Sequence, residues 1–173
     1  TVVRAIISVK PGDMEIPEFG RGNWFKKSVN TGAKWAQLEL TVFGGPYDRR
    51  KVWDNIFVDG DKMGQSGIPV AKEIGLRTLR SIIESHNNLD PADMSEAAQS
   101  KRQISGIDQL NGMEICAKIK VEKGTNGYAD QNKILIVLTP NSKDFISGGA
   151  APITSQAPQP QATASGPVPD WAR

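Results

Sequence analysis

The sequence contains one cysteine and one histidine in 173 residues. A single cysteine cannot form a disulfide within the chain, and paired Cys or His ligands for zinc are absent. Cys116 lies in an alternating, strand-like segment, 113–121, and its isolation is typical of a reducing cytoplasm. No apolar run approaches the roughly 20 residues of a membrane-spanning helix. The first residues also lack the apolar region and the cleavage site of a signal peptide, so we expect no membrane association.

Motifs of the common enzyme classes are missing as well. The sequence has no Walker A loop and no Gly-x-Ser-x-Gly motif. Asp54, Asp59 and Asp61 could together bind a divalent cation, as in a metal-dependent nuclease, but solvated acids at a strand end explain them equally. The sequence therefore predicts a protein that is not an enzyme and has no cofactor.

Residues 35–58 have the pattern of a β-hairpin. In the first arm every second residue from Ala36 to Val42 is apolar, and Val52, Ile56 and Val58 continue the pattern in the second arm. The connection 44–48, GGPYD, contains the glycines and the proline of a turn. One face of this hairpin should therefore be buried.

Aromatic and basic residues fall on or beside the opposite face of the same hairpin. Trp35, Trp53 and Phe57 alternate with the apolar positions, and the cations 49–51 follow the turn. Aromatic rings beside cations can stack nucleic-acid bases and neutralise phosphates. The alternative is that these rings are core aromatics beneath a second layer, since large apolar side chains are mostly buried.

Charge is unevenly distributed along the chain. The net charge is only +2, but between residues 21 and 53 seven cations face two acids. This local excess predicts an anion-binding surface. A solvated, lysine-rich face is the alternative.

The remaining elements follow from periodicity and turn residues. We expect strands at 2–9, 113–122 and 132–138, a long helix from 69 to about 86, and a weaker helix at 92–103 that forms a surface insertion. Segment 13–34 should be a long, partly β connection. The last strand is apolar on both faces, which is typical of a central or closing strand. From residue 146 the Pro-, Ala- and Gln-rich composition predicts disorder, giving a folded domain at 1–145 and a tail at 146–173.

This order, strand-strand-strand-helix-strand-strand, predicts a mainly β protein with inserted helices. It matches the five-stranded oligonucleotide/oligosaccharide-binding (OB) barrel, which binds ligands on strands two and three and on the loops joining strands one to two and four to five. The aromatic and basic residues fall at or near these places. The predicted DNA-binding residues are Trp24, Phe25, Lys26, Lys27, Lys34, Trp35, Arg49, Arg50, Lys51, Trp53, Phe57, Lys118, Lys120 and Tyr128.

Three segments carry a resemblance: GGPYDRRKVWDNIFV, AKEIGLRTLRSIIES and MEICAKIKVEKG with GYADQNKI. They resemble a family of phage and prophage proteins, often described only as a domain of unknown function, that is related to phage single-stranded DNA-binding proteins. The resemblance spans roughly residues 2–145. It implies an OB-fold protein that coats single-stranded DNA during phage DNA replication or recombination, in the cytoplasm of the infected bacterial host.

Two alternatives stay open at this point. A phage structural protein or replisome adaptor would use the same aromatic and basic face for protein contacts, because Trp and Arg are also frequent in protein–protein hot spots. The tail departs from the acidic tails of the family, since Asp170 is its only acid. It could bind replication or recombination proteins through Trp171, or it could serve only as a solubilising segment.

Overall fold

The computed structural model describes residues 1–125 and 127–147, so the predicted tail lies outside the described residues except for its first two. Six strands, two α-helices and three short 3-10 helices make up the described part. The fold is mainly β, and each predicted strand and helix is present. In chain order the elements are β1 (Val2–Val9), η1 (Pro17–Phe19), β2 (Phe25–Lys27), β3 (Lys34–Phe43), η2 (Gly45–Tyr47), β4 (Lys51–Asp59), α1 (Val70–Asn87), α2 (Glu96–Arg102), η3 (Ile107–Leu110), β5 (Glu114–Glu122) and β6 (Gln131–Leu138).

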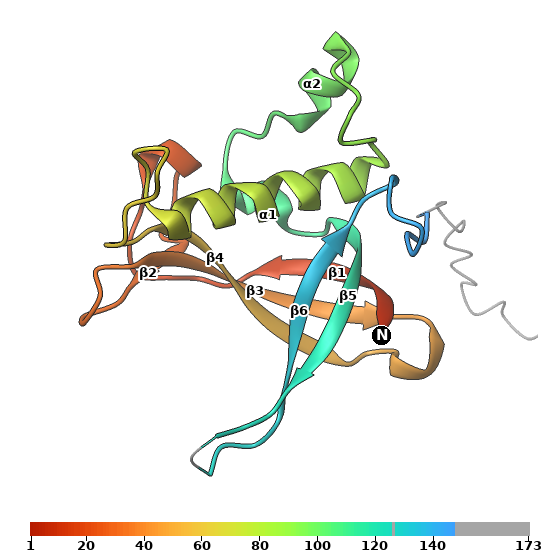
Figure 1. Cartoon of the computed structure of the whole chain (residues 1–173), viewed down its shortest axis with the longest axis horizontal. Coiled ribbons are helices and arrows are strands. Elements are labelled where there is room, and N and C mark those ends of the chain that lie inside the picture. The colour runs from red at the N-terminus through yellow and green to blue at the C-terminus, as the bar shows by residue number, and fades with distance from the viewer. Residues whose placement is uncertain (126, 148–173) are drawn as a thin grey trace, which may run out of the picture.

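All six strands belong to one open antiparallel sheet. Its order is β2-β3-β1-β5-β6. Strands β2 and β1 pair with different parts of one edge of β3, and β4 pairs with the opposite edge. In the centre of the sheet, Ala5 of β1 lies opposite Val42 on one side and Ile115 on the other. The sheet curls until β4 and β6 come close (Figure 1), but no hydrogen-bonded ladder joins these two strands in the described part of the chain.

The inward face of the sheet forms the hydrophobic core. Every second residue of β3 from Ala36 to Val42 is buried, and so are Val52, Ile56 and Val58 of β4. These are the positions that the alternation predicts, because successive side chains of a strand point to opposite faces. The predicted buried face of the hairpin is therefore confirmed.

Helix α1 crosses the sheet and packs Leu79, Ile82 and Ile83 against the core (Figure 1). Its close contact with β4 requires a glycine: a Cβ atom at Gly75 would lie 1.7 Å from the carbonyl oxygen of Phe57. The absence of a side chain thus costs helix propensity but lets the helix approach the strand backbone. The helix stops where Asn88 adopts a left-handed conformation.

The second helix is shorter than predicted and is attached by a buried ion-pair network. It begins after Ser95, whose hydroxyl accepts a hydrogen bond from the third helical backbone N–H. Arg102 of α2 and Arg80 of α1 each donate to the same buried carboxylate oxygen of Glu84, at 2.8 Å. A buried carboxylate needs such partners, so the two arginines attach α2 to α1 through charge.

Strand β6 is an edge strand rather than a central one. Within the described residues it pairs only with β5. An irregularity in the ladder between Lys118 and Ile119 leaves Leu135 and Ile136 54% and 53% exposed. Apolar residues on both faces of this strand therefore include an uncovered surface, and the expectation of a central strand is wrong. The alternative, a closing strand, is consistent with the approach of β6 to β4.

In the described residues, neither α-helix combines the length and the apolar character required to cross a bilayer.

Candidate nucleic-acid interface

The outward face of the β3–β4 hairpin places aromatic and polar side chains in rows. In the first row Lys26 of β2 lies beside Trp35 of β3, and Trp35 lies opposite Phe57 of β4. Further along the hairpin Glu39 lies opposite Trp53. We call the outward side chains of β3 and β4, together with Lys26 and Lys10, the hairpin platform.

The aromatic residues of the platform differ in exposure. The rings of Trp35 and Phe57 lie 6.0 Å apart at an interplanar angle of 48°, and both residues are half-buried. This tilted pair is a stabilising cross-strand contact in its own right. Trp53 is 51% exposed and is the platform ring most accessible to a ligand. Trp35 and Phe57 are thus partly packed, whereas the ring of Trp53 is open to solvent, and whether any of these rings stacks a base stays a prediction.

A carboxylate at the centre of the platform binds two of its cations. Glu39 accepts from Lys51 at 2.9 Å and from Lys10 at 3.0 Å. These contacts, with the Lys51 hydrogen bond first, hold the pKa of Glu39 below its ordinary value of 4.5. The triad keeps one net positive charge, so the platform is less positive than its count of lysines indicates.

Other predicted cations are also partly neutralised. Lys34 binds Asp59 at 2.7 Å, and Arg49 lies 3.5 Å from Asp48. Lys26 donates to the side-chain oxygen of Gln37 at 3.0 Å, which leaves its charge uncompensated. Two exposed cations, Lys27 and Arg50, form no ion pair with a described residue. The guanidinium group of Arg50 lies 5.1 Å from the ring centre of Tyr47 instead.

Some predicted site residues lie elsewhere. Phe25 is fully buried and packs on Phe19, with ring centres 5.7 Å apart, so its assignment to a DNA-binding surface is wrong. Its position in β2 turns it inward, while the next residue, Lys26, faces the platform. Trp24 is half-buried against the core and donates to the Arg21 carbonyl oxygen at 3.1 Å.

Lys118 also lies away from the platform. It is on β5, which β1 separates from β3, and it contacts Asp144 at 3.3 Å. The structure therefore does not bring Trp24, Phe25 or Lys118 together with the hairpin platform.

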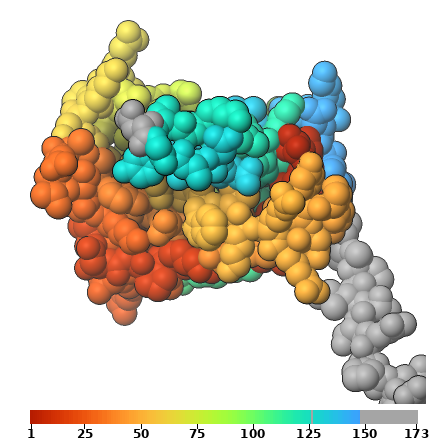
Figure 2. Space-filling view, turned by 90° about the horizontal axis from the view of Figure 1, so that it is seen from below, coloured from red at the N-terminus to blue at the C-terminus, as the bar shows by residue number. Residues whose placement is uncertain are grey.

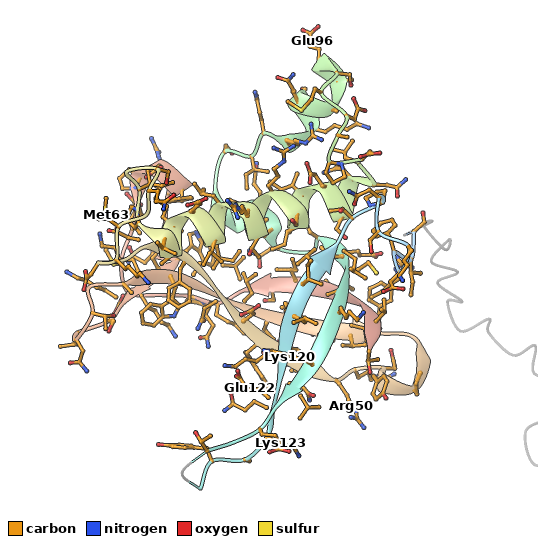
Figure 3. All side chains as sticks on the ribbon, in the orientation of Figure 1. Arg50, Met63, Glu96, Lys120, Glu122 and Lys123 are labelled. Carbon is orange, nitrogen blue, oxygen red and sulfur yellow. The ribbon has the colours of Figure 1, made fainter. Side chains whose placement is uncertain are left out.

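The β5–β6 hairpin extends beyond the sheet as an arm, which Figure 1 shows below the strands. Lys120, Glu122 and Lys123 lie along this arm (Figure 3). Lys120 is 4.0 Å from Glu122, and Lys123 binds Asp130 at 2.7 Å. Tyr128, at the end of the arm, is 76% exposed.

A hollow lies between the arm and the platform. It has a volume of about 400 Å³ and is lined by Lys51 and Trp53 of β4 and by residues 130–132 of the arm. Figure 2 shows the arm beside β4. The predicted site residues Lys51, Trp53, Lys120 and Tyr128 thus lie on one side of the molecule.

The sequence pattern did not identify two members of this surface. Lys10 follows the first strand and reaches Glu39 across the β1–β3 pair. The sequence provides little indication that Lys10 belongs to this surface, since a lysine after a strand is common on any protein surface. Tyr47 could have been identified more easily, because it is an aromatic residue in the turn directly before Arg49 and Arg50.

Asp54, Asp59 and Asp61 do not form a metal-binding cluster. Asp59 binds Lys34, and the resulting hydrogen bond lowers the pKa of Asp59. Among the described residues, no group of three or more His, Cys, Asp or Glu side chains is arranged to hold a metal ion.

Comparison with known proteins adds no assignment: the chain matches no model of a protein family and no curated protein.

Asp54 stands at an inward position of β4, between the buried Val52 and Ile56. Burial raises the pKa of this carboxyl above its ordinary value of 3.8, although a hydrogen bond from the Asn55 backbone N–H partly opposes the shift. Ionisation of Asp54 is therefore easier in the unfolded chain, and stability decreases as pH rises from 3.8 through the raised pKa.

We expect Asp54→Asn to raise the melting temperature at neutral pH, because the amide keeps the shape of the side chain and removes the buried charge. The difference from wild type should vanish below pH 3.8, where the carboxyl is protonated in both states. Thermal denaturation, followed by circular dichroism from below pH 3.8 to neutral pH, measures the difference in melting temperature. The control is Asp13→Asn, at an exposed position. A variant that melts earlier at neutral pH contradicts the prediction.

Proposed function

We propose that the protein binds single-stranded DNA without sequence specificity on the hairpin platform. The observation that carries the proposal is the exposed ring of Trp53. It lies on the same outward face as the Trp35–Phe57 pair, from which the outward Gln37–Asn55 pair separates it, and this face also presents cations. Every base has a π-face, so a stacking platform accepts any sequence, while cations contact only the phosphates. The proposed role is binding, with no catalytic step.

The arrangement of strands supports the same proposal. We infer that β1, β3, β4, β5 and β6 form a partly open OB barrel, since their sheet order is that of the OB fold with the β4–β6 seam unpaired. The platform then occupies strands two and three of the barrel. The arm occupies the place of the loop between strands four and five, which is the second ligand-binding element of that fold.

The biological setting is proposed from the sequence resemblance alone. A protein of this kind would cover single-stranded DNA during phage DNA replication or recombination in the bacterial host, and it would use the platform for every strand it meets.

A protein-binding role of the same platform is the second candidate. The observation that favours it is the neutralisation of cations within the surface, by Glu39 for Lys10 and Lys51 and by Asp59 for Lys34. Paired cations beside aromatic rings are also common in protein interfaces. Salt dependence separates the two roles, because phosphate binding releases counterions.

Binding to single-stranded DNA should weaken steeply with salt. If about three to five phosphates are neutralised, the slope of log K against log salt should lie between about −2 and −3.5. Fluorescence anisotropy with single-stranded, duplex and RNA oligonucleotides of equal length, at several salt concentrations, tests the proposal. Binding that is equal or tighter for duplex DNA would overturn it, and salt-independent capture of a protein would favour the second candidate.

Alanine substitution should distinguish the two tryptophans. Trp53→Ala should weaken binding by about 1–3 kcal/mol, the effect of losing one stacked base, with little change in melting temperature because the ring is half exposed. Trp35→Ala should lower both affinity and stability, since its ring also packs on Phe57. The control is Ile74→Ala, an exposed apolar residue of α1. Unchanged affinity in Trp53→Ala would exclude stacking at that ring.

Removing the central acid should strengthen binding. Glu39→Gln frees Lys10 and Lys51 for phosphates, so affinity should rise and the salt slope should steepen by about 0.7 for each additional phosphate. Stability should fall above pH 4.5, because a carboxylate whose pKa is lowered stabilises the fold there.

Anisotropy titrations measure the affinity, and Glu96→Gln on α2 is the matched control for net charge. Weaker binding with an unchanged melting temperature would show that the Glu39 triad orders the DNA-binding surface instead of competing with it.

A further inference from the structure

A second hollow lies at the mouth of the curled sheet, between the β3–β4 turn and the base of the arm. It has a volume of about 160 Å³, and we call it the mouth pocket. Val42 and Val52 form part of its floor and are themselves buried. Figure 2 shows the chain's first residues, in dark red, between the arm and the turn at this place. The pocket is therefore a slot with an apolar floor that opens to the surface.

The rim of the mouth pocket carries two cations, a tyrosine and a side-chain amide. Arg50 and Tyr47 come from the turn, and Lys120 and Asn132 come from the two strands of the arm. Arg50 forms no ion pair with a described residue and lies over the ring of Tyr47 at 5.1 Å. Lys120 is only loosely paired with Glu122, at 4.0 Å. Figure 3 shows Arg50 and Lys120 on the same lower side of the molecule.

The chemistry of this slot matches one nucleotide. Apolar walls accept the faces of a base, an amide such as that of Asn132 can donate to and accept from a base edge, and two cations can bind a phosphate. A purely apolar ligand would leave both rim cations desolvated without a partner, at a cost in free energy. An anionic group attached to a planar ring satisfies the floor and the rim together.

The mouth pocket is continuous with the hairpin platform. Asn132 lines both the mouth pocket and the hollow beside Trp53. Lys51 and Trp53 of β4 line that hollow, whereas Val52 of β4 and the preceding Arg50 line the mouth pocket. A DNA strand with one base stacked on Trp53 would therefore have to extend only past Asn132 to reach the mouth pocket.

We infer that the mouth pocket receives one base of the bound strand, turned out of the stack, with its phosphate between Arg50 and Lys120. This inference rests on the proposed single-stranded DNA binding and adds a specific contact to it. Turning out a base costs little in a single strand, which has no base pair to break. The site gives the protein a preference among bases at one position, while the remaining contacts are independent of sequence.

Photo-crosslinking tests the inference without requiring a fixed binding register. Oligothymidylate containing 5-iodouracil is bound to the full chain and irradiated, and the crosslinked peptides are mapped by mass spectrometry. We expect crosslinks at Tyr47 as well as at Trp53. Crosslinks at Trp53 but none at Tyr47 overturn the inference and leave the proposed function intact, whereas failure to bind the oligonucleotide overturns both.

Two kinds of variant complete the test. Tyr47→Ala and Asn132→Ala should each weaken oligothymidylate binding roughly fivefold or more, the loss of one base contact. Val121→Trp should fill the pocket from its edge, because Val121 lines it and is 60% exposed, so folding should be preserved. This variant should lose the Tyr47 crosslink and keep the Trp53 crosslink. Met94→Trp, at an exposed site near α2, is the control for adding a tryptophan.

A free nucleotide is the other source of the same chemistry. Thymidine monophosphate alone is titrated while the side-chain amide signal of Asn132 is followed by nuclear magnetic resonance. Saturation by the monophosphate, with no response of this signal to the oligonucleotide, would assign the pocket to a free nucleotide and overturn its role in strand binding. A retained Tyr47 crosslink in a correctly folded Val121→Trp would equally contradict the inference.

Discussion

Strand β3 is paired along both edges and buried on one face, and this constraint determines the positions of the candidate binding groups. Since Leu38 and Leu40 must point into the core, their neighbours Gln37, Glu39 and Thr41 must point outward. A shift of one residue in the register would reverse both faces. The same pairing aligns Trp35 with Phe57 and Glu39 with Trp53, so the core side of β3 indirectly arranges the ligand side.

The charges of the platform show how folding modifies a property of the sequence. The local excess of cations is real, but the β1–β3 and β3–β4 ladders bring Lys10 and Lys51 to the same carboxylate. Glu39 is itself buried, so its contacts with the two lysines also offset the cost of burying its charge. In the proposed DNA complex, Glu39 would in addition compete with the phosphates for the two lysines.

The sequence sufficed for features that depend on local pattern and failed for those that depend on distant contacts. Alternation identified the buried face of the hairpin, and helical spacing with its turn signals located α1. Phe25 was misassigned because its neighbours Lys26 and Lys27 suggested an exposed loop, whereas pairing with Ala36 turns it inward. The contact of Arg102 with Glu84 joins residues on two helices, which no periodicity reveals. Tyr47 and Asn132 are likewise far apart in sequence and meet only at the pocket.

The exposure of Trp53 and Val121 connects the fold to its proposed use. Isolated apolar residues at a surface need no explanation, but these two flank hollows that share Asn132. The hollow beside Val121 also carries Arg50 and the weakly paired Lys120. The arm could cover them only by bending back onto the platform. Ion pairs along its length, Lys123 with Asp130 and Lys133 with Glu122, join its two strands to each other. These pairs hold the arm's two strands to each other, so that the ring of Trp53 and the side chain of Val121 stay exposed, as the proposed binding of a flexible strand would require.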